Sequence, residues 1–167
     1  MKILIVSDTH GKDTYLEQVI EREKPIDMLL HLGDLEGSED YICAIAPCPV
    51  EMVSGNNDYF TQIEREKIIK IGAYKVFMTH GHRFGVNFGT EKITEIGREK
   101  GVDIVMLGHT HRPYLNILDD ITVLNPGSIS QPRQEGHNPS YMIMKIDNDK
   151  VFYDIFFVIK ALVLRLL

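Results

Sequence analysis

The chain has 167 residues, of which 44% are hydrophobic, and its formal net charge is −6 at pH 7. This length and hydrophobic content suit one compact domain over residues 1–167, and no repeat or change in composition indicates a second. The acidic balance argues against an extensive nucleic-acid footprint, which would favour a basic protein. Non-specific DNA binding is therefore disfavoured, although the total charge would not reveal a local basic rim.

Predicted strands and helices alternate over the first two thirds of the chain. Short apolar runs that begin at Ile3, Met28, Val50 and Ile104 predict strands, and those without alternating polar residues are typical of burial on both faces. Apolar residues at helical spacing predict a helix that ends before Pro25. Further helices are predicted to begin near the N-cap residues Ser38 and Thr90.

Strand signals dominate the later part of the chain. Residues 67–71 and 74–79 are predicted to form a hairpin, and strands are predicted at 122–124, 141–146 and 151–158, with a turn at 147–149 between the last two. Helices thus come early and antiparallel strands late. This order predicts an α/β fold, a four-layer α/β/β/α sandwich of two mixed β-sheets flanked by helices.

Almost every predicted core strand ends near a residue that can bind a metal ion. The candidate ligands are carboxylates, imidazoles and one amide, and glycines adjoin most of them: Asp8, His10, Asp34, Asn56, His80, His109 and His111. Loops at the carboxyl ends of strands project from a rigid sheet edge, which holds short side chains in place. We therefore expect these strand ends to converge on one site.

The ligand types indicate which metals could bind. Imidazole, carboxylate and amide groups without thiolate favour manganese, iron, cobalt, nickel or zinc. Seven ligands are too many for one tetrahedral site, but they suit two divalent ions roughly 4 Å apart with a bridging carboxylate. Two such ions would outweigh two aspartates and a bridging hydroxide, and the remaining positive charge would attract a phosphodiester anion.

Five ordered motifs carry a family resemblance. Asp8-Thr9-His10, Gly33-Asp34, Gly55-Asn56, Thr79-His80-Gly81-His82 and Gly108-His109-Thr110-His111 resemble the blocks of the calcineurin-like metallophosphoesterase superfamily. Residues 125–128 and the short chain resemble its small prokaryotic phosphodiesterase branch.

The resemblance implies a role for each matching residue. Asp8, His10, Asp34 and His111 would hold one metal, whereas Asp34, Asn56, His80 and His109 would hold the other, with Asp34 as the bridge. It also implies a phosphodiesterase for a small or nucleotide-like substrate, in which a metal-bound hydroxide attacks phosphorus. Two Mn²⁺ ions are expected, with Ni²⁺, Zn²⁺, Fe²⁺ or Co²⁺ as alternatives.

One position departs from the family pattern. Many members have a histidine after the asparagine of the third block, where it is thought to protonate the leaving group, but this chain has Asn57. Because asparagine cannot act as a general acid, we expect weak activity on poor leaving groups.

Other polar residues near the motifs are candidates for different roles. Arg112, Asn57 and His82 are candidate substrate contacts, although a solvated loop is an equal alternative for His82. His31 is expected to be a hydrogen-bonded core histidine, with support of Asp34 as its alternative. His137 lies in a predicted loop and is not expected to be a ligand.

The remaining expectations concern location and partners. Cys43 and Cys48 have neither redox nor zinc-site spacing and are expected to be small buried hydrophobes. The N-terminus lacks the features of a signal peptide, so a cytoplasmic protein without membrane attachment is expected. The apolar C-terminal segment at about 159–167 is too short and too charged for a membrane span, and it could mediate homo-oligomerisation. The rival function is a non-catalytic metal-binding interaction or scaffold module of the same fold, as in the eukaryotic retromer subunit that resembles this branch.

Overall fold

The computed structural model describes residues 1–148 and 150–159. Helices and strands alternate up to β3, the hairpin β4–β5 and helix α3 precede β6, and strands alone follow. In chain order the elements are β1 (Lys2–Val6), α1 (Thr14–Glu23), β2 (Met28–His31), α2 (Glu39–Ile45), β3 (Val50–Met52), β4 (Glu66–Ile71), β5 (Tyr74–Thr79), the 3₁₀ helix η1 (His82–Phe84), α3 (Glu91–Glu99), β6 (Ile104–Met106), β7 (Pro113–Ile117), β8 (Thr122–Pro126), β9 (Ser140–Asp147) and β10 (Lys150–Phe157).

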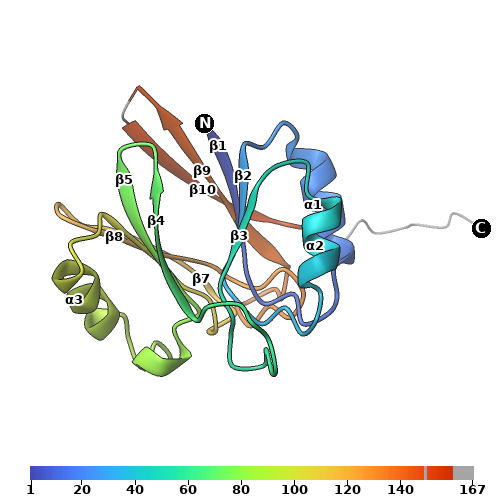
Figure 1. The fold of residues 1–167 in the computed structure, drawn as a ribbon, viewed down its shortest axis with the longest axis horizontal. Coiled ribbons are helices and arrows are strands. Elements are labelled where there is room, and N and C mark those ends of the chain that lie inside the picture. Colours follow the sequence, from blue (N-terminus) through green and yellow to red (C-terminus); the bar gives the residue numbers. More distant parts are fainter. Residues whose placement is uncertain (149, 160–167) are drawn as a thin grey trace, which may run out of the picture.

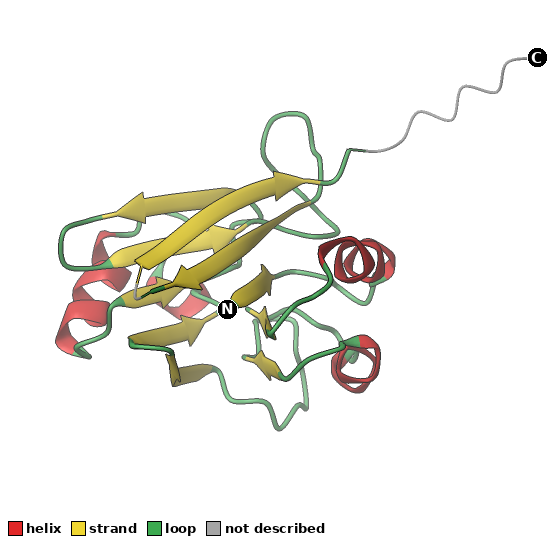
Figure 2. Ribbon diagram, turned by 90° about the horizontal axis from the view of Figure 1, so that it is seen from above, coloured by secondary structure: helices red, strands yellow, loops and turns green. Residues whose placement is uncertain are grey.

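The strands form two five-stranded sheets that pack face to face (Figure 2). The first sheet has the order β10-β9-β1-β2-β3, in which β1 pairs with β2 in parallel and with β9 antiparallel. The second has the order β4-β5-β6-β8-β7, in which β5, β6 and β8 are parallel and the two edge strands are antiparallel. Both sheets are therefore mixed, as predicted.

Alternation along the strands divides the core into layers. In β1, Ile3 and Ile5 point into the cluster between the two sheets, whereas Leu4 and Val6 point toward the cluster that contains α1 and α2 residues. All four of these side chains are completely buried, which explains why the run has no polar residue. The first sheet is thus covered on its outer face by α1 and α2.

The second sheet repeats this arrangement with α3. Met78 of β5 packs between the sheets, whereas Phe77 and Val105 pack on the other face with Ile93 of α3. The two outer helical layers lie on opposite sides of the paired sheets (Figure 1). The predicted four-layer α/β/β/α sandwich is therefore confirmed.

Several local predictions differ from the structure. Cys43 is exposed and Cys48 is half-buried, so the expectation of buried cysteines was wrong. Cys43 follows the buried Ile42 of α2, and one residue of helix turns the next side chain away from the core. Strand β7 adds an edge strand that the predicted ranges lack.

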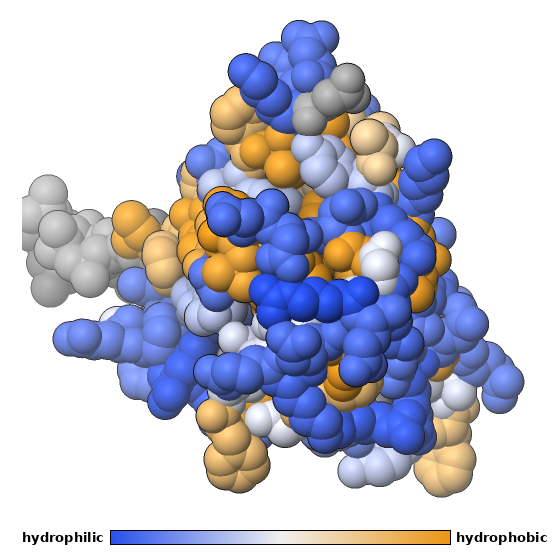
Figure 3. Space-filling view, turned by 90° about the vertical axis from the view of Figure 1, so that its left-hand side faces the viewer, coloured by the Kyte–Doolittle hydropathy of each residue, from blue (hydrophilic) through white to orange (hydrophobic). Residues whose placement is uncertain are grey.

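No helix in the described ranges is long and apolar enough to cross a membrane. Most of the predicted apolar C-terminal segment lies outside those ranges, from residue 160 onward. The face seen in Figure 3 is largely polar, with apolar side chains in smaller groups. On the edge strand β10, Phe152, Ile155 and Phe157 are exposed.

Candidate metal centre

The predicted ligands come from loops that follow five strands. Asp8 and His10 follow β1, Asp34 follows β2, Asn56 follows β3, His80 follows β5, and His109 and His111 follow β6. Backbone hydrogen bonds join these loops within a sheet, as from Asp8 N to Gly33 O (3.0 Å) and from Gly108 N to His80 O (3.2 Å). The loops of both sheets meet where His109 N donates to Asp8 Oδ2 (3.3 Å).

Five candidate ligands have left-handed backbones. The φ angles are 58° at Asp8, 48° at His10, 57° at Asp34, 68° at His109 and 57° at His111. Such a conformation costs about 1–2 kcal/mol at a residue with a side chain. Strain of this kind persists where surrounding structure imposes it, and it concentrates at functional sites.

Two glycines let the loops approach closely. A Cβ atom at Gly55 would overlap with the Asp34 carboxylate, and one at Gly108 would overlap with Ser7 Oγ and lie 3.1 Å from Asp8 Oδ2. These positions lack room for any side chain. The predicted association of glycines with ligands therefore reflects a steric requirement here.

A first group consists of Asp8, His10, Asp34 and His111. One potential ligand atom from each lies within 4.8 Å of those from the other three. His111 Nε2 is 3.1 Å from Asp8 Oδ1 and 3.3 Å from His10 Nε2. Two imidazoles and two carboxylates thus face one small volume, as the donor set of a transition-metal ion requires.

A second group lies on the other side of Asp34. Asp34 Oδ2 is 3.4 Å from His80 Nε2 and 3.8 Å from His10 Nε2, so this oxygen lies between the two groups. The rings of His80 and His109 have centroids 5.2 Å apart. The geometry fits a carboxylate that two ions could share.

Buried polar atoms without satisfactory hydrogen bonds provide an independent test of metal binding. Asp8 Oδ1 and His80 Nε2 are buried, and neither makes a hydrogen bond of acceptable geometry within the described residues. Leaving such atoms unsatisfied is costly. Both are potential ligand atoms that face the site, so the residues present fit divalent metal ions.

Three imidazoles have their Nδ1 atom engaged away from the site. His10 Nδ1 is 2.7 Å from Glu36 Oε1, His80 Nδ1 is 2.7 Å from Leu32 O, and His111 Nδ1 is 2.6 Å from Gln131 O. An acceptor at Nδ1 places the proton there and leaves Nε2 free to bind a metal. His109 differs, because its Nε2 contacts Asn87 Nδ2 at 2.9 Å and its Nδ1 is left for a ligand role.

The carboxylates and imidazoles of the site shift one another's pKa values. Burial alone would raise the pKa of Asp8, but contacts with His111 and His80 hold that pKa below its ordinary value. Burial also opposes ionisation of Asp34, yet His80 and the Asn57 amide lower its pKa strongly. Burial would lower the pKa of His80, whereas Asp34 and Asp8 raise it above 6.5. Metal binding at His80 therefore competes with protonation of its imidazole.

The two adjacent asparagines occupy different positions. Asn57 donates its backbone N–H to Asp34 Oδ1 (2.9 Å) and its side-chain amide to Asp34 Oδ2 (3.0 Å). Asn56 is exposed, and its amide donates to Asn57 Oδ1 at 3.2 Å. Asn57, and not Asn56, is therefore the asparagine that contacts the Asp34 carboxylate in this structure.

His31 and His137 lie in different surroundings. His31 is completely buried, receives a hydrogen bond from Gly33 N (3.2 Å) and contacts Thr9 Oγ1 (3.2 Å), as expected of a core histidine. Burial lowers its pKa to about 4, so it is neutral. His137 is exposed and contacts Pro132 O, away from the ligand groups.

His82 lies at the wall of the site. Its ring centroid is 5.6 Å from that of His80 and 6.1 Å from that of His109. Burial, followed by these two neighbours, lowers its pKa to about 4. His82 also lines a pocket on the Asn56 side.

Two residues that hold the site in place, Asp58 and Glu36, were not predicted from the sequence. Asp58 accepts hydrogen bonds from the backbone N–H groups of Asp34, Leu35, Glu36 and Gly55, at 2.7 to 2.8 Å. Glu36 orients His10. An acidic residue near a ligand motif can be a solvated loop residue or a residue that holds a ligand in place. Only the contacts in the folded protein distinguish these two roles.

Comparisons with known proteins agree with this geometry. A family model described as "Calcineurin-like phosphoesterase superfamily domain" matches residues 1–149. A "Probable metallophosphoesterase" of Methanothermobacter thermautotrophicus is 33% identical over 156 residues, which cover 90% of this chain and 89% of the relative. "Phosphodiesterase MJ0936" of Methanocaldococcus jannaschii is 30% identical over 146 residues, covering 76% and 83%.

Solved structures show the same fold. A predicted phosphoesterase from Streptococcus pneumoniae superposes with a TM-score of 0.80 at 31% identity, covering 93% of this chain and 88% of that one. Vps29 from Entamoeba histolytica, solved with zinc, gives 0.75 at 24% identity, covering 94% and 99%.

The sandwich fold and the carboxylate–imidazole group at its strand ends define a metal-dependent phosphoesterase domain. The chain belongs to the calcineurin-like phosphoesterase superfamily. Its curated relatives include small prokaryotic metallophosphoesterases, and membership implies that divalent metals are its cofactors.

Proposed function

We propose that this protein is a dinuclear metal-dependent phosphodiesterase that hydrolyses a small or nucleotide-like diester. The position of Asp34 carries the proposal, because its Oδ2 lies 3.8 Å from His10 Nε2 and 3.4 Å from His80 Nε2. One carboxylate can then serve two ligand sets. The name of the M. jannaschii relative supports a diester as substrate.

The proposed ligand sets follow the two groups around Asp34. The first set is Asp8, His10, Asp34 and His111, and the second is Asp34, Asn56, His80 and His109. Asn56 needs a rotation of its exposed side chain, since its amide now donates to Asn57. Mn²⁺ is the proposed metal, and Ni²⁺, Zn²⁺, Fe²⁺ and Co²⁺ suit the same donors.

The two ions, when bound, supply a nucleophilic water at neutral pH and offset charge on the phosphoryl oxygens. The chain supplies the remaining groups. Arg112, exposed directly after His111, offers a guanidinium to the phosphate. Asn57 keeps the Asp34 carboxylate oriented through two hydrogen bonds, and His82 forms the wall beside His80. The neutral amide of Asn57 cannot donate a proton to the leaving group.

Reconstitution tests the proposal. Metal-free protein is loaded with Mn²⁺, Ni²⁺ or Zn²⁺ and assayed on bis-p-nitrophenyl phosphate, p-nitrophenyl phosphate and cyclic nucleotides. We expect metal-dependent turnover of the diesters, and loss of that turnover in Asp34→Asn. Asp119→Asn is the matched control, because Asp119 is an exposed carboxylate in the turn between β7 and β8.

The rival function is a non-catalytic interaction module. The likeness to Vps29 concerns the fold alone, and the exposed Ile155 and Phe157, which share one face of the edge strand β10, offer a surface for a partner. Unsatisfied ligand atoms at the site suit a metal-dependent enzyme, and turnover distinguishes it from a metal-binding module. Absence of turnover on every substrate, with both ions bound, would favour the module.

We also propose a cytoplasmic location, one functional domain over residues 1–167 and a homo-oligomer formed through the apolar C-terminal segment. Free Cys43 and Cys48 suit a reducing compartment. Sedimentation of the full chain and of a chain truncated after residue 159 tests the oligomer, which the truncated chain should not form.

A further inference from the structure

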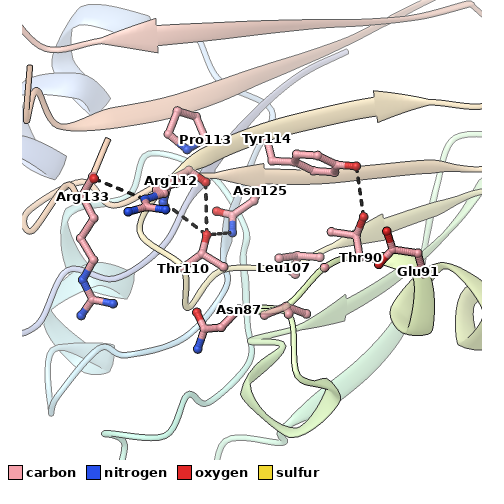
Figure 4. Close-up of a pocket in the computed structure, with 12 residues that line it drawn as sticks. Asn87, Thr90, Glu91, Leu107, Thr110, Arg112, Pro113, Tyr114, Asn125 and Arg133 are labelled. Atoms are coloured by element: carbon pink, nitrogen blue, oxygen red, sulfur yellow. Dashed lines mark hydrogen bonds between the residues drawn. The ribbon is translucent and has the colours of Figure 1, made fainter. Parts of the chain in front are cut away.

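A pocket of about 590 Å³ opens beside the metal centre, between the segment before α3 and strand β7 (Figure 4). Its volume lies in the range of pockets that bind small organic ligands. Its lining combines an apolar floor, formed in part by Val86 and Leu107, with charged and polar groups around it. This mixture suits a molecule with both an apolar ring and an anionic group.

The pocket adjoins the metal ligands directly. Thr110, which lies between His109 and His111 in the chain, lines the pocket. Asn87 also lines it and contacts His109 Nε2 at 2.9 Å. A phosphate at the metal centre would therefore have one of its ester groups within reach of this pocket.

One end of the pocket is cationic. Arg112 and Arg133 lie together there in Figure 4, and Arg112 Nε donates to Arg133 O at 3.3 Å. Arg133 N also donates to His111 O at 3.0 Å. Neither guanidinium forms an ion pair with any of the described residues, whereas Arg98 is paired with Asp120. Two uncompensated guanidinium groups beside the metal centre favour a phosphate at this end.

The other end offers a ring surface and a carboxylate. The Tyr114 side chain is 37% exposed, and its hydroxyl contacts Thr90 Oγ1 at 3.1 Å, which orients the ring. Glu91 lines the pocket close by, and in Figure 4 it lies with Thr90 and Tyr114 away from the two arginines. A flat ring can pack on Tyr114, and hydroxyl or amino donors can bind Glu91.

We propose that this pocket binds one esterified alcohol of the substrate, and that this alcohol is a nucleoside. Arg112 and Arg133 bind the phosphate end, Tyr114 packs on the base, and Glu91 accepts hydrogen bonds from hydroxyl or amino groups. The inference rests on the proposed phosphodiesterase function, and it adds the substrate class and the side of the metal centre on which the nucleoside lies.

A second hollow provides the rival location. A pocket of about 320 Å³ on the Asn56 side is lined by Tyr59, Phe60 and His82. It also contains an exposed aromatic ring next to the site, since Tyr59 is 74% exposed. Tyr59→Ala is therefore the matched control for Tyr114→Ala.

The test compares two diesters with the same leaving group. The p-nitrophenyl ester of thymidine 5′-phosphate carries a nucleoside, and methyl p-nitrophenyl phosphate does not. The ratio of kcat/KM for the thymidine ester to that for the methyl ester should fall about tenfold in Tyr114→Ala, as base stacking on a tyrosine predicts. Tyr114→Phe keeps the ring and should retain most of the ratio. An unchanged ratio in Tyr114→Ala, or a fall in Tyr59→Ala instead, overturns the proposal.

A binding measurement separates this inference from the proposed function. Calorimetry with thymidine 5′-monophosphate should show weaker binding to Tyr114→Ala and to Arg112→Gln than to wild type, whether or not any diester is hydrolysed. Weaker binding without turnover would support the pocket while the phosphodiesterase proposal fails. Turnover of the thymidine ester with equal nucleotide binding by all three proteins would refute the pocket and leave the phosphodiesterase proposal standing.

Discussion

Substitution of Asp58 tests how the ligand loops are held together. Asp58 Oδ1 accepts hydrogen bonds from Leu35 N and Glu36 N, both at 2.7 Å, and Oδ2 accepts from Asp34 N at 2.8 Å and Gly55 N at 2.7 Å. One carboxylate thus joins the loop after β2 to the loop after β3. Asn in its place keeps a single acceptor oxygen and loses the charge.

The structure sets the size of the effect. Hydrogen bonds to a charged group contribute roughly 1.5–3 kcal/mol each, and Asp58→Asn loses the acceptor for two of the four donors. Three of the four bonds are part-buried and one is exposed, so water compensates in part. We expect a loss of about 3 kcal/mol in the free energy of unfolding, which is a large share of the ~5–15 kcal/mol typical of a domain.

Urea unfolding followed by circular dichroism measures this loss, and calorimetry of Mn²⁺ binding reports its effect on the site. Asp58→Asn should unfold at lower urea and bind Mn²⁺ more weakly, because fewer hydrogen bonds hold the loop that carries Asp34. Asp119→Asn should match wild type in both assays. A change below about 0.5 kcal/mol in Asp58→Asn, the usual size for a surface substitution, would refute the reasoning.

Three further predictions concern the metals and the reaction. Glu36→Gln should weaken the binding of one metal ion by roughly 10-fold to 100-fold and leave the binding of the other unchanged, because Glu36 orients only His10 among the ligands. A two-site titration in which both affinities match those of wild type would contradict this role. Metal affinity should fall as the pH falls through the raised pKa of His80, because protonated His80 cannot bind a metal; a flat pH profile of the affinity would contradict it. Aryl phosphodiesters of rising leaving-group pKa should show a steep fall in rate, since Asn57 cannot donate a proton; a shallow slope would reveal another acid.

The sequence predicted the layers of the fold because burial leaves a direct mark on composition. Ile3 to Val6 is buried on both faces and contains no polar residue, and residues 67–79 form the predicted hairpin. The pairing of β1 with β9 joins residues about 140 positions apart. Local periodicity contains no information on such a pairing, so the strand orders could not be read from it.

Edge elements were predicted less well. Strand β7 has a half-buried, partly polar pattern and begins with Pro113, which fits an edge strand but weakens the strand signal. Cys43 was assigned to the core from the average behaviour of cysteine, whereas its position on α2 relative to Ile42 decides its exposure.

At the site, residue types could be predicted but contacts could not. The structure brings together Asp8, His10, Asp34 and His111, the group that the family resemblance implied for one metal. Asn56 and Asn57 have the same side chain, and the conformation of one loop decides which of them contacts Asp34. The contact between Glu36 and His10 joins two loops, and both residues have a positive φ.

The metal content of wild type and Asp34→Asn tests the central claim most directly. Metal-free protein is loaded with Mn²⁺, freed of excess ion by gel filtration and analysed by mass spectrometry, with Asp119→Asn as the control. We predict two ions per chain in wild type and in the control, and weakened binding of both ions in Asp34→Asn. A single ion in wild type, or one ion retained at wild-type affinity in Asp34→Asn, would contradict a carboxylate shared by two metals.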